Sequence, residues 1–189
     1  MTTRYERTRA AALACQGSRD WYAQARRLIA AEAARVHVKP EYFADVLAIT
    51  SPRISVSRNW YLTVGYCRTL SENTMMRSTR AALAHWRITG VIRGPKTGPF
   101  ARALRGDESA IVLDTWMAAF FRCEQSEFDT KRRGKYEQTI RQVANDLGWT
   151  NCQVQAAVWC WTVTQYRRNP GFYPSQIALF DRDLPDWGR

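Results

Sequence analysis

The sequence has little that could anchor it in a membrane or export it. No run of about eighteen apolar residues occurs among its 189 residues, although a membrane-spanning helix needs about twenty. The N-terminus carries Arg4, Arg7 and Arg9 but no following leucine-rich stretch and cleavage site, so it does not match a signal peptide. We therefore expect a cytoplasmic protein with no membrane partner.

Patterns that bind metals are also scarce. The chain has two histidines and an odd number of cysteines, with no C-x-x-C pair. The closest cysteines, Cys152 and Cys160, are eight residues apart, whereas zinc and iron-sulfur sites need closely spaced ligands in sets of four. We expect free, buried thiols, no metal and no cofactor. The five cysteines are Cys15, Cys67, Cys123, Cys152 and Cys160.

Lysine is rare, and acidic residues are nearly missing from one third of the chain. The net charge is +11, and 24 of the 28 basic residues are arginine. Between Arg53 and Arg105, ten basic residues stand against one acid, Glu72. A general bias toward arginine would not remove acids from one segment. The segment therefore predicts a surface that binds a phosphate backbone, with DNA as the partner.

Apolar residues recur at helical spacing, and no segment alternates as a half-buried strand does. With 46% hydrophobic residues, the chain is expected to form a single all-α domain over residues 1–189, with a C-terminal tail, 170–189, packed on the surface. The expected helices are one capped by Ser18 that reaches 33, then 40–52, 55–70, 77–88, one starting at Pro95, one after Leu113, 136–147 ending at Gly148, and one from a Thr150–Gln153 capping box to Pro170.

The helical pattern stops between Thr89 and Pro95. Gly90 and Gly94 bracket this break, and proline is tolerated in the first turn of a helix. A short helix-turn-helix connection is therefore expected here.

Three motifs resemble those of the helix-hairpin-helix DNA glycosylases. Gly94-Pro95-Lys96-Thr97 looks like the G-x-K-T end of the hairpin, and Leu113-Asp114-Thr115 looks like the V-D-T motif that follows it. Their lysine and aspartate are eighteen residues apart, as in the endonuclease III branch. The stretch FADVLAITSPRISVSRN, at 43–59, is similar to the apolar helix and L-S-x-Q-x-(T/S) motif of that family. The resemblance covers residues 43–121 as a glycosylase-like core, with the helix-hairpin-helix motif near 77–105.

The resemblance implies an enzyme that cleaves the N-glycosidic bond of a base flipped out of DNA. Lys96 would attack the sugar and form a Schiff base, Asp114 would assist, and Arg53 would fill the space that the base leaves. Phosphate would be held by Arg93 and by backbone N–H groups at the start of the next helix. The residues expected to contact DNA are Arg53, Arg58, Arg93, Gly94, Thr97 and Arg102.

The sequence also departs from the family. Ile92 replaces a hairpin glycine, Pro99 stands early in the following helix, Trp116 replaces a histidine, and the iron-sulfur cysteines are absent. These departures point to a compact branch found in bacteriophages, a relative of which acts on hypermodified thymine. The chain would then work in a bacterial or phage-infected host cell.

Each of these residues also has a simpler interpretation. Asp114 could be only a helix N-cap, Lys96 a phosphate contact or a solvated side chain, and the basic run at 131–135 a solvated helix start. Trp60 or Trp116 could stack on a base or belong to the core. Two other functions stay open: a DNA-binding module without catalysis, and a phage enzyme that modifies thymine in DNA.

Overall fold

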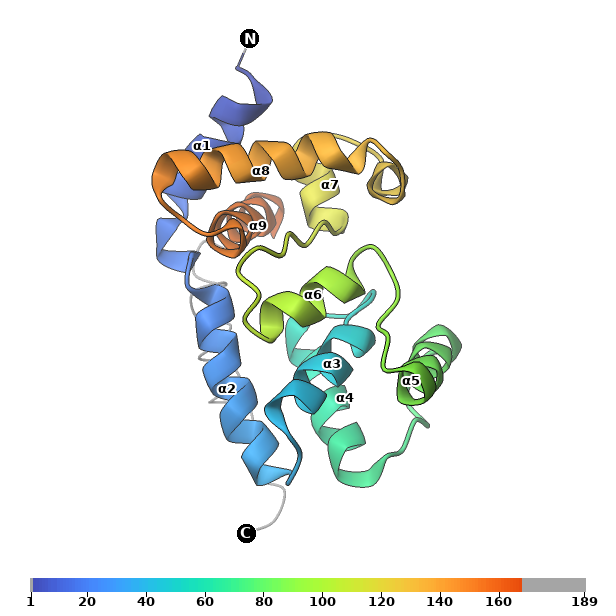
Figure 1. Cartoon of the computed structure of the whole chain (residues 1–189). Helices are drawn as coiled ribbons and strands as arrows, with labels where there is room; N and C mark the ends of the chain where they lie inside the picture. The colour runs from blue at the N-terminus through green and yellow to red at the C-terminus, as the bar shows by residue number, and fades with distance from the viewer. Residues whose placement is uncertain (1, 168–189) are drawn as a thin grey trace.

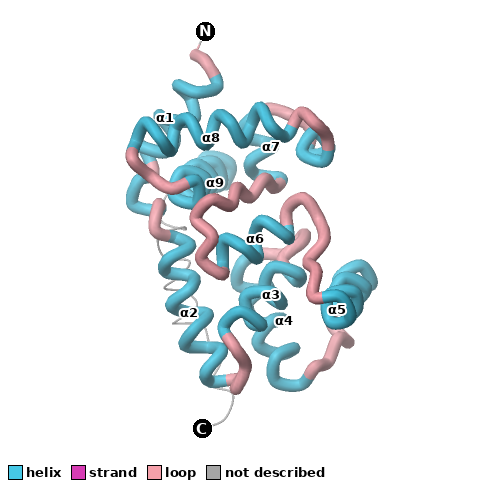
Figure 2. The backbone as a smooth tube through the Cα atoms, in the orientation of Figure 1, coloured by secondary structure: helices cyan, strands magenta, loops and turns pink. Residues whose placement is uncertain are grey.

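The computed structural model describes residues 2–167, and every regular element in this range is helical (Figure 2). The expected all-α fold is confirmed for this part of the chain. The elements are α1 (Arg4–Ala14), the 3-10 turn η1 (Gln16–Ser18), α2 (Trp21–Arg35), α3 (Pro40–Thr50), α4 (Val56–Thr69), α5 (Arg77–Thr89), α6 (Thr97–Leu104), α7 (Thr115–Phe121), the 3-10 turn η2 (Gln125–Asp129), α8 (Arg133–Leu147) and α9 (Asn151–Arg167).

The helices form two groups that pack against each other (Figure 1). In one group, α2, α4, α5 and α6 surround or contact the apolar helix α3, where Phe43 and Val46 are fully buried. In the other group, α1, α7 and α8 pack around α9, with Met117 and Ile140 in the core. Contacts between α2 and α9 join the two groups, and the segment 105–114 passes between them.

Capping residues in the sequence predict several helix boundaries correctly. Ser55 caps α4 by accepting a hydrogen bond from the Arg58 N–H, and Gly148 ends α8 with a φ of 64°. The capping box at the start of α9 is confirmed, since Gln153 N–H donates to Thr150 Oγ1 and Thr150 N–H donates to Gln153 Oε1. Such contacts satisfy backbone groups that a helix end leaves without partners.

The cap expected at Ser18 is wrong. Helix α2 begins at Trp21 after Asp20, and Ser18 instead lies buried in η1 with its hydroxyl 3.5 Å from Cys15 Sγ. The packing of η1 against α9 holds the Ser18 hydroxyl away from the start of α2, so it cannot cap that helix. This packing is a tertiary contact that the local sequence does not encode.

Helix α1 was not expected, although the sequence contains its start signal. Glu6 N–H donates to Thr3 Oγ1 at 3.1 Å and Thr3 N–H donates to Glu6 Oε2 at 2.7 Å, which forms a capping box. Its buried residues, Thr8, Ala11 and Ala12, are small, and Tyr5 is the large side chain of α1 that packs against the same core, so the helical period is weakly marked.

The break between α5 and α6 falls where the glycines predicted it. Gly90 and Gly94 have φ values of 68° and 112°, a region that side chains with a Cβ rarely occupy. Helix α6 begins at Thr97, two residues after Pro95, and Pro99 falls in its first turn, where a missing N–H costs no intrahelical bond. Both α5 and α6 pack against α3.

The cysteines are free thiols, as expected, although only Cys67, Cys152 and Cys160 are buried. Within residues 2–167, no group of three metal-ligating side chains comes together. In the same range, no helix combines the length and the apolar character that crossing a membrane requires. The expected helix end at Pro170 and the surface tail, 170–189, lie outside the described residues.

Candidate active site

A cavity of about 440 Å³ lies where the two helix groups meet. Its walls include six aromatic side chains and come from α2, α3, α4, α6, α7 and α9, so it depends on both groups being packed together. Concave, mostly apolar sites with a few polar groups are typical of small-molecule binding. The aromatic side chains that line it are Trp21, Tyr22, Trp60, Phe100, Trp116 and Trp159.

Lys96 lines this cavity from the end of the loop before α6. Its Nζ donates a weak hydrogen bond to the Ser51 carbonyl at 3.5 Å and lies 5.8 Å from the centre of the Phe100 ring. Burial lowers the pKa of Lys96, and the charge of Asp114 partly opposes this shift. The amine is therefore more easily deprotonated than that of an exposed lysine.

Asp114 lines the same cavity from the N-terminus of α7. Its Oδ1 accepts hydrogen bonds from the N–H groups of Trp116 and Met117, both at 3.0 Å, so the N-cap interpretation is correct. Its Oδ2 accepts from Trp159 Nε1 at 3.0 Å. A carboxylate has about four acceptor positions, so these three bonds hold the group rigidly and still leave capacity for a ligand. The structure thus brings Lys96 and Asp114 to one site.

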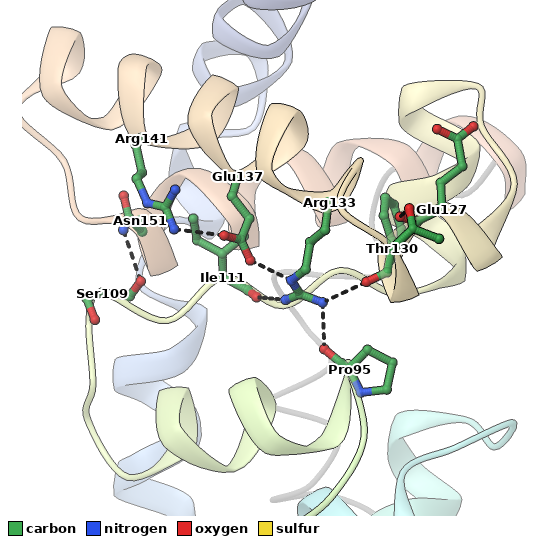
Figure 3. Close-up of polar contacts among 10 residues, drawn as sticks. Pro95, Ser109, Ile111, Glu127, Thr130, Arg133, Glu137, Arg141 and Asn151 are labelled. Atoms are coloured by element: carbon green, nitrogen blue, oxygen red, sulfur yellow. Dashed lines mark hydrogen bonds and ion pairs between the residues drawn. The ribbon is translucent and has the colours of Figure 1, made fainter.

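Arg133 connects the two segments that carry these residues to α8 (Figure 3). Its Nη1 donates to the carbonyl of Pro95, next to Lys96, at 2.9 Å. Its Nη2 donates to the carbonyl of Ile111, three residues before Asp114, at 3.2 Å. One planar guanidinium therefore sets the spacing between the two loops.

Glu137 holds this guanidinium in place. Its Oε1 accepts from Arg133 Nε at 2.6 Å, and its Oε2 accepts from Arg141 Nη2 at 2.8 Å (Figure 3). The basic run at 131–135 is thus more than a solvated helix start, because one of its members points inward and is only 20% exposed.

Replacing Arg133 is expected to destabilise the protein and loosen the site. In Arg133→Met, the carbonyls of Pro95, Phe128 and Ile111 and the carboxylate of Glu137 lose a charged donor. We therefore expect the free energy of unfolding to fall by about 1–3 kcal/mol in urea titrations. Arg141→Met is the matched control, because Arg141 is half exposed and, within residues 2–167, its one ion pair is with Glu137; its expected loss is below about 1 kcal/mol. Equal losses in the two variants would contradict the connecting role of Arg133.

Arg53 lies at the cavity in a strained conformation. It is exposed, follows the end of α3, and has a φ of 63°, in the left-handed region that favours glycine. Non-glycine residues held in this region tend to occur at functional sites. Arg53 thus lies at the cavity, and its contact with DNA stays a prediction.

The other residues expected to contact DNA spread over a wider surface. Arg58 is exposed on the first turn of α4, and Arg93 and Gly94 are exposed in the loop before α6. Thr97 is half-buried, and its hydroxyl donates to the Arg93 carbonyl, which holds the loop closed. Arg102 lies away from the cavity lining and pairs with Asp107 at 3.4 Å.

The basic segment 53–105 is partly neutralised in the fold. Four of its arginines pair with acids, three of which come from outside the segment. Within residues 2–167, the exposed arginines of this segment that form no ion pair are Arg53, Arg58, Arg77, Arg80 and Arg93. The positive surface is thus smaller than composition indicates, and it includes the edge of the cavity at Arg53.

Several residues of the site were not expected from sequence. Trp60 and Trp116 line the cavity, as proposed for base stacking, but so do Trp21, Phe100 and Trp159. Periodicity assigns such aromatic residues to a core, because it reports which face of a helix is apolar and not whether that face meets a cavity.

Comparison with known proteins places the chain in a family. Residues 3–167 match the family described as a family of unknown function, DUF7178. No curated protein and no solved structure is similar enough to match the chain.

Proposed function

This chain belongs to the DUF7178 family of unknown function, and we propose that it is a DNA glycosylase-like enzyme that acts on a base flipped out of DNA. One observation carries the proposal: Lys96 and Asp114 come from different loops and line one aromatic cavity. Burial lowers the pKa of Lys96, which suits a nucleophilic amine. A solvated lysine or a simple surface phosphate contact would not need such burial.

Asp114 would stabilise the charge that forms as the base leaves. Breaking the bond between C1′ and the base sends the electron pair to the base and leaves positive charge on the sugar. A fixed carboxylate in a buried site stabilises that charge without reorganising. Because three N–H donors already hold Asp114, an electrostatic role suits it better than repeated proton transfer.

Lys96 would complete the reaction as the nucleophile. The lone pair of its neutral Nζ forms a bond to C1′ while the released base takes up a proton. Opening of the sugar ring then gives an iminium between Nζ and C1′, from which the 3′ phosphate can be eliminated. The aromatic walls of the cavity would stack on the flipped base meanwhile.

The exposed arginines near the cavity would bind the DNA backbone. Single variants Arg53→Ala, Arg58→Ala and Arg93→Ala are each expected to reduce the slope of log affinity against log salt by about one, whatever the DNA sequence. The measurement is fluorescence anisotropy with a labelled duplex at several salt concentrations. Arg141→Ala is the control, since Arg141 lies outside the basic segment on α8 and should leave the slope unchanged. Equal slopes for all variants would contradict this DNA-binding surface.

Borohydride trapping tests the proposed function directly. The protein is mixed with duplexes that carry an abasic site, altered bases or hypermodified thymine, and borohydride reduces any iminium to a stable covalent adduct. An adduct, or base release without an adduct, supports the enzyme. Salt-dependent binding with neither outcome would instead favour a DNA-binding module, and activity confined to modified thymine would favour the phage base-modification role. Absence of both binding and adduct would refute the proposal.

A further inference from the structure

Gln155 presents a hydrogen-bond donor to the cavity. It lies on α9, is 3% exposed and lines the cavity. The Tyr22 hydroxyl donates to its Oε1 at 2.7 Å. Among residues 2–167, Nε2 of Gln155 donates to no protein acceptor. Unlike Trp21 Nε1, this atom is not fully enclosed by protein. A deeply buried amide donor without a protein partner points to a ligand.

Tyr22 fixes which end of the amide faces the cavity. Burial raises the pKa of Tyr22 well above its ordinary value, so the phenol stays protonated and always has a hydrogen to donate. Gln155 Oε1 is its acceptor. Rotating the amide by half a turn would leave this buried hydroxyl hydrogen without an acceptor, which is unfavourable. The NH₂ group of Gln155 is therefore held toward the cavity.

The walls near Gln155 suit a flat, neutral ring. Trp21 and Phe100 have ring centres 6.4 Å apart at an interplanar angle of 31°, and Trp21 lies 6.1 Å from Trp159. Flat ligands stack on such side chains. Because Gln155 is uncharged, it can select the pattern of donors and acceptors on the ring edge without requiring a charged ligand.

We propose that Gln155 reads the flipped base and selects one that turns a carbonyl oxygen toward Nε2. A base that places an exocyclic amine at that position would set two donors against each other in a buried site. The site thus takes keto bases in preference to their amino counterparts. This inference rests on the proposed function, since the ligand is taken to be a base.

Free bases test this assignment without DNA and without catalysis. The matched pairs are hypoxanthine against adenine and uracil against cytosine. The members of each pair differ by an oxygen or an amine on one ring carbon, and by a hydrogen that only the keto member carries on the neighbouring ring nitrogen. Binding is measured by NMR, up to the solubility limit of each base. We expect the wild-type protein to prefer the keto member on the order of tenfold. Gln155→Leu should bring the ratio close to one, and Gln155→Glu should reverse it, because its free oxygen accepts from an amine.

Tyr22→Phe separates base reading from a merely structural role. Without the hydroxyl the amide can rotate, so the keto preference should fall while both bases still bind. A purely structural Gln155 would instead weaken both members of a pair equally. Circular dichroism and urea unfolding check that each variant is folded.

The outcomes distinguish the two proposals. A keto preference that is lost in Gln155→Leu, together with no reaction on DNA, would support base reading and refute the enzyme. Trapped adducts with an unchanged keto preference in Gln155→Leu would refute base reading and keep the enzyme. Failure of the wild type to bind any of the four bases, or to distinguish them, overturns the role of Gln155.

Discussion

Lys96→Ala is expected to abolish the covalent adduct that borohydride traps between the protein and an abasic site. The chain has four lysines, and Lys96 is the one that lines the cavity. Removal of its amine should lower the trapping rate by at least about 100-fold, while binding to the same duplex changes little. The measurement is the fraction of labelled DNA that migrates with the protein on a denaturing gel.

Two control variants show whether a loss of adduct comes from the amine itself. Lys131→Ala removes an exposed lysine outside the cavity and should trap like the wild type. Lys96→Met should fold at least as well as the wild type. Folding lowers the pKa of Lys96, so burying the charged amine at neutral pH reduces the stability of the wild-type protein. Methionine removes this cost. An adduct that persists in Lys96→Ala would assign the chemistry to another amine.

The same pKa shift predicts the pH dependence of trapping. Only the neutral amine attacks, and an unperturbed lysine has a pKa of 10.5. Because burial lowers the pKa of Lys96, the rate should reach half of its maximum below pH 10.5. A half-maximal rate at or above that pH would mean that Lys96 is solvated when DNA is bound.

Much of the fold could be predicted because helix ends depend on short-range chemistry. Ser55 and Gly148 act through their own hydroxyl or backbone freedom, so their roles are visible in a few residues. The failure at Ser18 has the opposite cause, since packing of η1 against α9 decides where that hydroxyl lies. Helix α1 is a third case, because its capping box is followed by buried residues that are mostly small and mark the helical period weakly.

The candidate site was predictable only in part. Lys96 and Asp114 could be proposed together because the resemblance supplied both a spacing and a reason for them to meet. Gln155 could not, because α9 is apolar on nearly every side and its periodicity does not say which face meets a cavity. The inward direction of Arg133 likewise depends on where the carbonyls of Pro95 and Ile111 lie.

Charge counted along the sequence also overstated the basic surface. Arg68 and Arg105 lie in the segment that lacks acids, yet they pair with Glu32 and Asp45 of neighbouring helices. The fold therefore places acidic residues from other parts of the chain beside a segment that has almost none of its own. Arg53, Arg58 and Arg93 keep no such partner within the described residues, so they are the better candidates for phosphate contacts.

Asp114→Asn is expected to separate base release from adduct formation. The substitution removes the negative charge from the cavity, so release of an intact base should slow by about 10²–10³-fold. Trapping at a preformed abasic site should survive, because no base has to leave. Loss of Asp114 also removes the interaction that raises the pKa of Lys96, which leaves the amine more readily neutral.

Asp114→Ser controls for the role of this residue as a helix cap. Asparagine turns an NH₂ group toward a donor, either Trp159 Nε1 or the backbone N–H groups of α7, so part of its effect could be structural. Serine caps a helix about as well as aspartate does and adds no such conflict. If base release stays slow in Asp114→Ser while the protein remains as stable as the wild type, the missing charge is the cause. Recovery of base release in Asp114→Ser would reduce Asp114 to the cap of α7 and leave Lys96 as the main chemical group of the cavity.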